Sequence, residues 1–379
     1  MRRIAALVLS VALSSLRLEA AAADCDAPAM MADGWSVSSP SKQGLDPALI
    51  CAIGARLKDL SGASANGVVI ARHGVLVYEQ YFAGADQRWP EHSWGEPLPI
   101  LPHDATTKHD ISSITKSVVA LLVGIALNRG ALKSVDAPAL DFFPEYADLR
   151  APDRDRITVQ DLLTMRAGLR WIYQPYLSFW RRIDASPDPY RLILEQPVTA
   201  TPGTEFRYNN GSADLVGAII QRAAHRPLGE FAKEALFEPL DVTDWEWGQM
   251  ANGDLGASWG LRLRPRDFAK IGQLVLDRGQ WRGRRIVPEA WIKDMTARQV
   301  TLPEGAFGYY WWLRTATIAG RQIDLVEGMG WGGQSLYVIP SLDLIVAVTA
   351  GVYNYEGKGS QGLAGDTARD MALHAALGG

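Results

Sequence analysis

The apolar positions of the chain change their spacing from one third of the sequence to the next. Near the N-terminus, two short runs rich in β-branched residues occupy positions 68–72 and 75–81. His73-Gly74 between them is a turn signal, so this segment predicts a β-hairpin. The last hundred residues again favour strands, which are predicted at 307–313, 322–326, 335–339 and 342–349.

The middle of the chain has longer apolar segments, several with the 3.6-residue spacing of amphipathic helices. Helices are predicted at 118–127, 159–165, 212–224, 266–276, 288–295 and 363–377. Strands near both ends and helices between them predict a sheet assembled from both ends of the chain.

We therefore expect an α/β protein of the α+β type, in which an antiparallel sheet is flanked by helices and a helical lobe is inserted. The predicted sheet domain comprises residues 24–110 and 255–379, and the predicted helical lobe comprises residues 111–254. A substrate would lie in a cleft between the two.

The composition, with 47% hydrophobic and 21% charged residues, is that of a globular protein with a large core. The net charge of −4 gives no basic surface, so we do not expect a nucleic-acid partner. Six histidines and two cysteines form no zinc motif, and we expect neither a metal nor another cofactor. His103 and His109 are interpreted as loop residues.

The first 23 residues have the pattern of a signal peptide. Arg2 and Arg3 precede an apolar run at 4–16, and small residues lead up to Ala23. The run is too short to span a bilayer. We expect cleavage near Ala23, no integral membrane span, and a periplasmic or secreted protein.

Cys25 and Cys51, the only cysteines, both lie near the expected mature N-terminus. An oxidising compartment favours a disulfide between them, which would contribute about 3 kcal/mol by loop entropy. Two independent thiols are the alternative.

The most informative chemistry lies at the start of the apolar helix, where Lys116 follows Ser113 by three residues. Residues three apart share a helix face, so the hydroxyl and the amine can meet. A serine becomes a strong nucleophile when a base takes its proton, and a buried lysine that has lost its own proton can do this. Backbone N–H groups of the first helical turn would face an oxyanion formed there.

The Ser-x-x-Lys spacing is a weak signal alone. With 21 serines and 9 lysines, roughly 0.5 matches are expected by chance. A second match, from Ser39 to Lys42, lies in a polar segment with a proline and is interpreted as a surface turn. The alternative for Lys116 is a solvated cation at the helix start.

Two further segments carry candidate site residues. Before the helix at 212–224, Tyr208 can hold or relay a proton beside a lysine, and Asn210 can orient the lysine and a substrate carbonyl. A packed tyrosine and a turn asparagine are the alternative. The glycine-rich segment 328–334 is the second. Its backbone can approach a ligand closely and offer an N–H to an oxyanion. The alternative is a glycine-rich hairpin without a role in binding.

In this order the motifs resemble the penicillin-recognising serine hydrolases. That family includes class C β-lactamases, serine D-alanyl-D-alanine peptidases, related esterases and 6-aminohexanoate-dimer hydrolases. The resemblance extends over about residues 33–376 and includes Asp161-Leu162-Leu163-Thr164-Met165. It implies a β-lactamase/DD-peptidase-like fold, Ser113 as nucleophile, Lys116 as its base, Tyr208 as a catalytic partner and Asn210 as a substrate-binding residue.

The third motif departs from the β-lactamase pattern. β-Lactamases and peptidases carry Lys-Thr-Gly or His-x-Gly there, whereas this chain sets Trp331-Gly332-Gly333 in that place. No local charge replaces the one that holds a substrate carboxylate. We therefore expect a small ester or amide that is uncharged or held differently, as in the esterase and 6-aminohexanoate-dimer hydrolase branch. β-Lactamase or D-alanyl-D-alanine peptidase activity is the alternative.

The resemblance also implies how a substrate is held. Trp331, Gly332, Gly333 and Gln334 are expected to bind it, and the main-chain amides of Ser113 and Gln334 are expected to form the oxyanion hole. A separate aromatic stretch is interpreted either as a mobile lid or as core packing; it comprises Trp171, Tyr173, Tyr176, Phe179 and Trp180.

Two other functions are open. Gly256-Ala257-Ser258-Trp259-Gly260 matches the G-x-S-x-G nucleophile elbow, with Asp343 and His374 following in the required order. The polar, glycine-rich segment before it does not predict the buried strand that an elbow needs. The other alternative is a non-catalytic binding relative, against which the intact serine, lysine, tyrosine and asparagine set argues.

Overall fold

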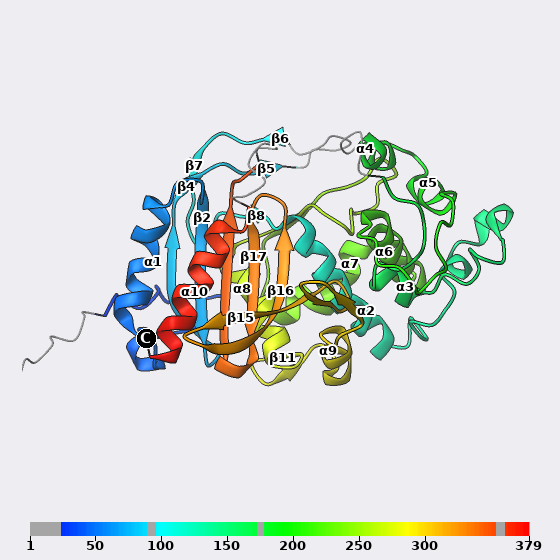
Figure 1. Ribbon diagram of the computed structural model, residues 1–379. Helices are drawn as coiled ribbons and strands as arrows, with labels where there is room; N and C mark the ends of the chain where they lie inside the picture. The colour runs from blue at the N-terminus through cyan, green and yellow to red at the C-terminus, as the bar shows by residue number, and fades with distance from the viewer. Residues whose placement is uncertain (1–23, 89–95, 173–177, 354–360, 379) are drawn as a thin grey trace, which may run out of the picture.

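The computed structural model describes residues 24–88, 96–172, 178–353 and 361–378 of the chain. Its centre is a nine-stranded sheet in the order β1-β3-β2-β18-β17-β16-β15-β14-β13 (Figure 1). These strands are β1 (Ser36–Val37), β2 (Ala65–Arg72), β3 (Val75–Tyr81), β13 (Val300–Leu302), β14 (Gly305–Phe307), β15 (Trp312–Ile318), β16 (Arg321–Gly330), β17 (Gln334–Ile339) and β18 (Leu344–Ala350).

Strand β2 pairs with β18, so the sheet joins segments from both ends of the chain, as predicted. Within the described sheet, β1 and β3 run parallel and the other neighbours run antiparallel. The sheet is therefore antiparallel, as expected, except at this edge, where the parallel pair of β1 and β3 makes it mixed.

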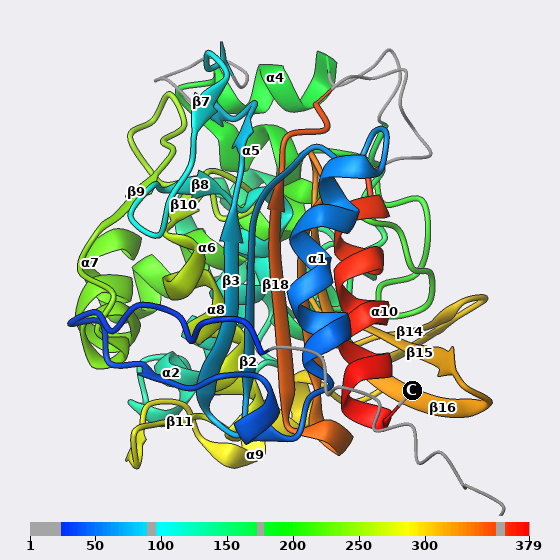
Figure 2. The ribbon, with the colours of Figure 1, turned by 90° about the vertical axis from the view of Figure 1, so that its left-hand side faces the viewer.

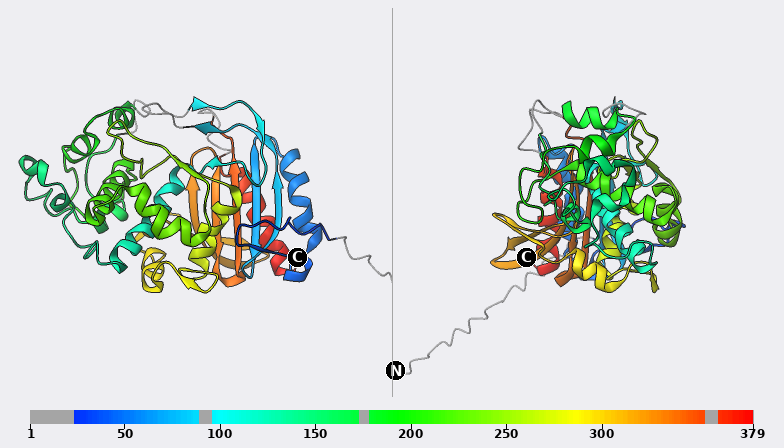
Figure 3. Two further views of the ribbon diagram at one scale, coloured as in Figure 1. Left: turned by 180° about the vertical axis from the view of Figure 1, so that it is seen from behind. Right: turned by 90° about the vertical axis from the view of Figure 1, so that its right-hand side faces the viewer.

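Helices cover both faces of the sheet. Helices α1 (Pro47–Asp59) and α10 (Leu363–Leu377) lie side by side on one face (Figure 2). Helix α8 (Pro265–Leu276) packs against β2, β17 and β18 on the other face (Figure 3). Because both faces are covered, all residues of β17 and β18 are buried, which explains their nearly continuous apolar sequences.

Most remaining helices form a layer beside the sheet (Figure 1). They are α2 (Thr115–Asn128), α3 (Val159–Leu163), α4 (Ser178–Asp184), α5 (Pro189–Leu194), α6 (Asn210–Ala224), α7 (Leu228–Ala232) and α9 (Glu289–Met295). Shorter helical turns are η1 (Ser41–Gln43), η2 (Ser112–Ile114), η3 (Ala139–Phe142), η4 (Pro144–Leu149), η5 (Lys233–Phe237), η6 (Glu238–Leu240) and η7 (Pro340–Leu342).

Small sheets complete the described fold. Strands β8 (His109–Asp110), β10 (Leu261–Leu263) and β9 (Trp245–Trp247) form one of them. The two-stranded pairs are β4 (Ala83–Gly84) with β7 (Leu101–Pro102), β5 (Gln87–Arg88) with β6 (Glu96–Pro97), and β11 (Gln280–Trp281) with β12 (Arg284–Arg285).

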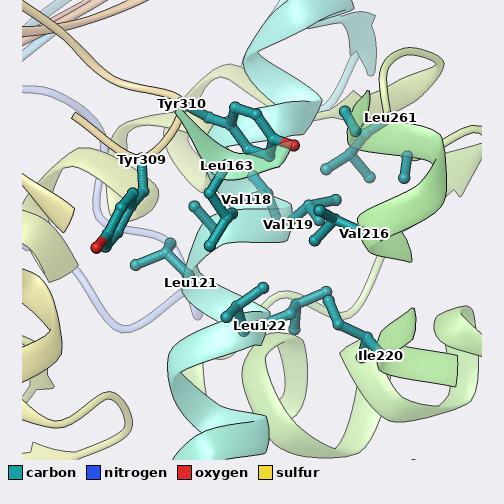
Figure 4. Packing of buried hydrophobic residues seen from close by; sticks show 14 of the residues in the cluster. Val118, Val119, Leu121, Leu122, Leu163, Val216, Ile220, Leu261, Tyr309 and Tyr310 are labelled. Carbon is teal, nitrogen blue, oxygen red and sulfur yellow. The ribbon is translucent and has the colours of Figure 1, made fainter. Parts of the chain in front are cut away.

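Helix α2 lies at the centre of the helical layer and is buried from Thr115 to Ala126. Its apolar side chains, among them Val119 and Leu122, face Val216 and Ile220 of α6 (Figure 4). A helix that is apolar on all sides needs neighbours on all sides. The unbroken apolar run in the sequence therefore became the core helix, and the segment that precedes it is anchored by that burial.

Two sequence expectations are wrong in detail. The single strand predicted at 307–313 is two strands, β14 and β15, separated by a turn at Tyr310 with a φ of 61°. Ser117 Oγ donates to the Tyr310 carbonyl at 2.8 Å, and the Tyr310 hydroxyl donates to Leu162 O at 3.1 Å. These contacts to distant segments hold the turn, and strand-like composition alone does not reveal them.

His109 is also misplaced by the sequence analysis. It lies in β8 with no exposed surface, and its Nε2 is 3.4 Å from Asp86 Oδ1. Pairing of β8 with β10 draws the residue into the interior. His103 does lie in a loop, where it is half-buried.

The predicted disulfide between Cys25 and Cys51 is confirmed and ties the first described residues to α1. The predicted signal peptide lies outside the described residues. In the described part of the chain, every helix is too short or too polar to cross a membrane. The division into a sheet domain and a helical lobe at the stated residues stays a prediction.

Candidate active site

Ser113 lies in the 3₁₀ turn η2, directly before α2 rather than within its first turn. Ser113 is partly exposed, whereas its neighbour Ser112 is buried. Ser112 has a φ of 49°, a conformation that costs free energy for a residue with a Cβ. Its amide donates to Asp110 Oδ1 at 2.9 Å, and its hydroxyl accepts a hydrogen bond from the Trp331 amide at 3.1 Å. These two bonds hold the strained turn that presents Ser113.

The structure brings Ser113 and Lys116 together, as their spacing predicts. Lys116 Nζ donates to Ser113 Oγ at 3.0 Å and to the carbonyl oxygen of Ser258 at 2.7 Å. Lys116 is 2% exposed, so the alternative of a solvated cation is wrong. A buried amine in contact with a partly exposed hydroxyl is the geometry that an activated serine requires.

Tyr208 and Asn210 lie at the start of α6, next to this pair. Lys116 Nζ is 5.1 Å from the centre of the Tyr208 ring, and that ring stacks on Trp312 with centroids 6.2 Å apart. Asn210 is buried, and its Oδ1 accepts no hydrogen bond from the described residues. The Tyr208 ring is thus a neighbour of the Lys116 amine, and Asn210 Oδ1 is a buried hydrogen-bond acceptor without a donor among the described residues.

The glycine-rich segment is placed where β16 meets the serine turn. A Cβ on Gly330 would lie 2.6 Å from the carbonyl oxygen of Ile111, and one on Gly328 would lie 3.0 Å from the side chain of Ile114. Only glycine allows so close an approach. The end of β16 is therefore pressed directly against the turn that carries Ser113.

Trp331-Gly332-Gly333 forms the tight connection from β16 to β17, with φ of 86° and 94° at the two glycines. The hairpin interpretation of this segment is therefore correct, but the hairpin also touches the nucleophile turn through the Trp331 amide. Gln334 begins β17. Its side-chain amide donates to the Ala350 carbonyl at 2.6 Å and accepts from the Ala350 N–H at 3.1 Å. The Gln334 side chain thus fastens the hairpin to β18.

A cation does reach this region, although it comes from a neighbouring strand. Arg314 of β15 lies over the ring of Trp312, and its Nη1 is 3.0 Å from Met329 Sδ and 3.1 Å from Glu327 Oε2. Burial raises the pKa of Glu327 and the charge of Arg314 opposes this. Sequence reasoning searched for a charge within the motif, whereas pairing of β15 with β16 supplies one from outside it.

Sequence reasoning also missed a buried carboxylate, Asp214 of α6. Its Oδ1 accepts a hydrogen bond from the Ser258 amide at 2.9 Å and its Oδ2 accepts one from the Ser258 hydroxyl at 3.1 Å. Burial raises the pKa of Asp214 to about 6, while the charge of Lys116 and the bonds from Ser258 lower it. The available signal was spacing, because Asp214 follows Asn210 by four residues and shares its helix face.

The geometry opposes the nucleophile-elbow alternative. Ser258 has no exposed surface, and its hydroxyl donates to Asp214 rather than to a histidine. Asp343 follows η7, and His374 lies in α10 with its Nδ1 2.8 Å from the Asp370 carbonyl. Residues 248–257, directly before Ser258, form turns with one isolated bridge between Gln249 and Leu255, and no strand leads into Ser258.

Only part of the aromatic stretch lies within the described residues. Trp171 and Trp180 are buried; Trp171 packs on Phe179 with centroids 5.3 Å apart, and Trp180 packs on Trp259 at 6.4 Å. The core-packing interpretation holds for these three residues. Tyr173 and Tyr176 lie outside the described residues.

Among the described residues, a cluster with the spacing of metal ligands is formed by Asp24, Cys25 and Cys51. The two sulfur atoms are bonded to each other, which removes them as thiolate ligands.

Comparison with known proteins places this arrangement in a family. The chain matches the family described as "Beta-lactamase" over residues 53–363, which include the serine turn, α6 and the glycine-rich hairpin. The chain belongs to the β-lactamase family. The resemblance stated from the motifs is thereby confirmed, as is the β-lactamase/DD-peptidase-like fold.

Relatives of this β-lactamase family member carry several names. The chain is 24% identical over 265 residues to "6-aminohexanoate-dimer hydrolase" of Paenarthrobacter ureafaciens, and the match covers 63% of this chain and 65% of the relative. It is 28% identical over 235 residues to "Esterase EstB" of Burkholderia gladioli, covering 59% and 55%. The matched part thus spans less than two thirds of these relatives.

A solved structure agrees on the fold. The octameric penicillin-binding protein homologue from Pyrococcus abyssi superposes with a TM-score of 0.65 at 22% identity, covering 87% of this chain and 77% of that chain. At that identity the likeness concerns the fold of this β-lactamase family member alone.

Proposed function

We propose that this protein is a serine hydrolase that cleaves small esters or amides through an acyl-enzyme on Ser113. The observation that carries the proposal is the 3.0 Å contact between Lys116 Nζ and the hydroxyl of a partly exposed Ser113. Burial of Lys116 and the fixed turn at Ser112 support it, because they pre-organise nucleophile and base in one geometry.

In the proposed reaction, uncharged Lys116 accepts the Ser113 proton while Ser113 Oγ bonds to the acyl carbon. The carbonyl oxygen becomes an oxyanion, which the main-chain amides of Ser113 and Gln334 stabilise. The bond to the leaving group then breaks, and the leaving alcohol or amine takes the proton from Lys116. Water repeats the sequence on the acyl-enzyme and releases the acid.

Tyr208 and Asn210 take supporting roles in this mechanism. The Tyr208 ring borders Lys116, where its phenol assists proton transfer. Asn210 offers a buried amide whose oxygen needs a donor, and a substrate N–H or the lysine amine supplies one.

The substrate class follows from the charges and the relatives. Arg314, the cation near the hairpin, is paired with buried Glu327. The Tyr208 ring beside Lys116 stacks on Trp312, which packs against Phe206, and this aromatic row offers apolar surface for an acyl or leaving group. An uncharged ester or linear amide fits this aromatic surface better than a substrate whose carboxylate needs an unpaired cation. The names of an esterase and of an amide hydrolase among the relatives support both substrate types.

The test is covalent labelling with a fluorophosphonate, followed by peptide mapping and a nitrophenyl-ester assay. We expect one labelled serine, Ser113, and no labelling of Ser113→Ala. Ser258→Ala is the matched control and should still be labelled. Absence of labelling in the parent protein would favour a binding relative, and loss in Ser258→Ala alone would favour the elbow. A chromogenic cephalosporin and a linear amide in the same panel test the β-lactamase alternative and the amidase branch.

We also propose that the protein is exported and acts in the periplasm or outside the cell. The signal-peptide pattern of residues 1–23 and the disulfide directly after it support this. N-terminal sequencing of protein expressed with its natural start is expected to begin near Asp24. A cytoplasmic protein that begins at residue 1 or 2 would overturn the proposal.

A further inference from the structure

A buried carboxylate is linked to the proposed base through a single residue, Ser258. Asp214 is 1% exposed and accepts two hydrogen bonds from Ser258, one from its amide and one from its hydroxyl. The carbonyl of the same residue accepts the 2.7 Å hydrogen bond from Lys116 Nζ. Ser258 is therefore fixed from one side by Asp214 and holds the lysine on the other.

We propose that Asp214 is a positioning residue, which holds Lys116 against Ser113 through Ser258 and stabilises the ammonium that forms when Lys116 accepts the serine proton. This inference rests on the proposed function. An activated nucleophile usually has a base that a third group orients. In this protein the nucleophile is Ser113 and the base is Lys116. The third group is Asp214, which does not contact Lys116 through a hydrogen bond of its own but acts through Ser258.

Two contacts fix the position of the Lys116 amine, one to Ser113 and one to Ser258. A lysine side chain has four rotatable bonds, so its amine does not stay beside a hydroxyl without a second contact. The Ser258 carbonyl provides that contact, and it belongs to a turn between β9 and β10 that lies 142 residues away in the sequence. The two hydrogen bonds to Asp214 hold this turn in register with α6, because they capture both polar donors of Ser258.

How strongly Asp214 stabilises the Lys116 ammonium depends on which other charged and titratable groups face Asp214. Lys116 from α2 is the charge that acts most strongly on it. Asp184 from α4 also faces it, but burial first and then the charge of Asp214 raise the pKa of Asp184 well above its usual value. Tyr190 from α5 and Tyr310 before β15 face it as well, and burial raises the pKa of both phenols. Of these two carboxylates, Asp214 is thus the one on which the charge of Lys116 acts.

The experiment compares Asp214→Asn with the parent protein over pH 4.5 to 9, with kcat/KM for a nitrophenyl ester and the fluorophosphonate labelling rate as readouts. Asparagine keeps the size and one acceptor but removes the charge. We expect kcat/KM of the variant to fall on the order of 100-fold at pH 8, within the range of general-base effects. The parent is expected to lose activity as pH falls through about 6, where Asp214 takes up its proton, and the variant is expected to lack that limb.

Asp254→Asn is the matched control. Asp254 accepts hydrogen bonds from Tyr190 and Gln221 in the same helical layer, and neither bond reaches Lys116. Its variant should keep the parent's rate and pH profile. Asp214→Glu retains the charge and is expected to recover part of the rate and the acidic limb, which a merely structural role for Asp214 does not predict.

Outcomes separate this inference from the proposed function. If the parent is labelled at Ser113 and Asp214→Asn matches its rate and pH profile, the positioning role fails and the serine hydrolase stands. If the parent is not labelled, the proposed function itself fails. If circular dichroism shows that Asp214→Asn does not fold, Ser258→Ala serves as the second test. This variant lacks the hydroxyl that donates to Asp214 but keeps the carbonyl that binds Lys116. We expect a five- to tenfold lower kcat with an unchanged KM. An unchanged kcat would contradict the role.

Discussion

The amine of Lys116 lies 2.7 Å from the carbonyl oxygen of Ser258, closer than the 3.0 Å that separates it from the hydroxyl of Ser113. The local partner comes from the same helical face, three residues away. The other comes from a turn that follows 142 residues later. The position of the base is therefore a property of the packed molecule and not of the Ser-x-x-Lys spacing alone.

Replacing Lys116 by arginine or by methionine tests its role as a base. Arginine keeps a positive charge but does not release its proton, and methionine removes the amine. Both variants are expected to lose on the order of 10²- to 10⁴-fold in kcat for an ester substrate. Lys42→Arg, at the exposed lysine of the second Ser-x-x-Lys run, is the matched control and should retain the parent's rate. A Lys116→Arg enzyme with near-normal kcat would show that no proton leaves this side chain.

Asp214→Asn is also expected to change how stability depends on pH. Burial raises the pKa of Asp214 from 3.8 to about 6 in the folded state, so the folded protein binds this proton more tightly than the unfolded chain. Ionising Asp214 therefore lowers the free energy of unfolding of the parent as pH rises from about 4 to 6, by up to about 3 kcal/mol. Asparagine does not ionise and avoids this loss.

The measurement for Asp214→Asn is urea unfolding at pH 4, 5, 6 and 7. Relative to the parent, the variant should gain stability across this series, even though its activity falls. Ser113→Ala removes no charge and should follow the parent at each pH. Parallel curves for the parent and Asp214→Asn would mean that Asp214 has an ordinary pKa in the folded protein.

Gly330→Ala tests the close approach of β16 to the serine turn. The new Cβ would meet the Ile111 carbonyl at 2.6 Å, and backbone has to move to relieve the contact. We expect a loss of about 1–3 kcal/mol in stability and a larger relative loss in kcat, because the displaced turn carries Ser113. Gly229→Ala meets the tip of the Leu255 side chain at 3.0 Å and is the control. Equal activity for both variants would contradict the proposed coupling.

Removal of the disulfide should affect stability and leave the chemistry intact. The bridge joins residues 26 positions apart and ties Cys25, near the start of the described chain, to Cys51 in α1. Cys25→Ala with Cys51→Ala is expected to lower the free energy of unfolding by about 3 kcal/mol. The value of kcat for the folded double variant should match that of the parent at a temperature well below its Tm. A comparable fall in kcat would connect the N-terminal segment to the site.

The features that the sequence alone predicted are those with a local cause. The apolar run at 118–127 predicted a buried helix, and its continuous burial confirms this. Helix geometry brings residues three apart onto one face, so the contact of Ser113 with Lys116 followed from spacing. The strands at both ends of the chain and the cysteine pair were likewise readable from pattern and composition.

Other features depend on which distant segments pack together, and no local pattern encodes them. Residues 307–313 look like one strand, yet contacts of Tyr310 to Ser117 and Leu162 hold a turn that separates β14 from β15. Arg314 reaches the hairpin because β15 pairs with β16, although no charge stands in the motif itself.

By itself, then, the sequence determined the helices α2, α3, α6, α8, α9 and α10, most of the long strands of the central sheet, the disulfide and the nucleophile–base pair, whereas α1, α4, α5 and α7 were not predicted. The tertiary structure decided the environment of that pair. Ser258, which matched a nucleophile motif, became the buried partner of Lys116 and Asp214. The physical reason is that hydrogen-bond partners of a buried polar group come from whatever segment burial brings within 3 Å, and that neighbour is chosen by packing of the whole chain.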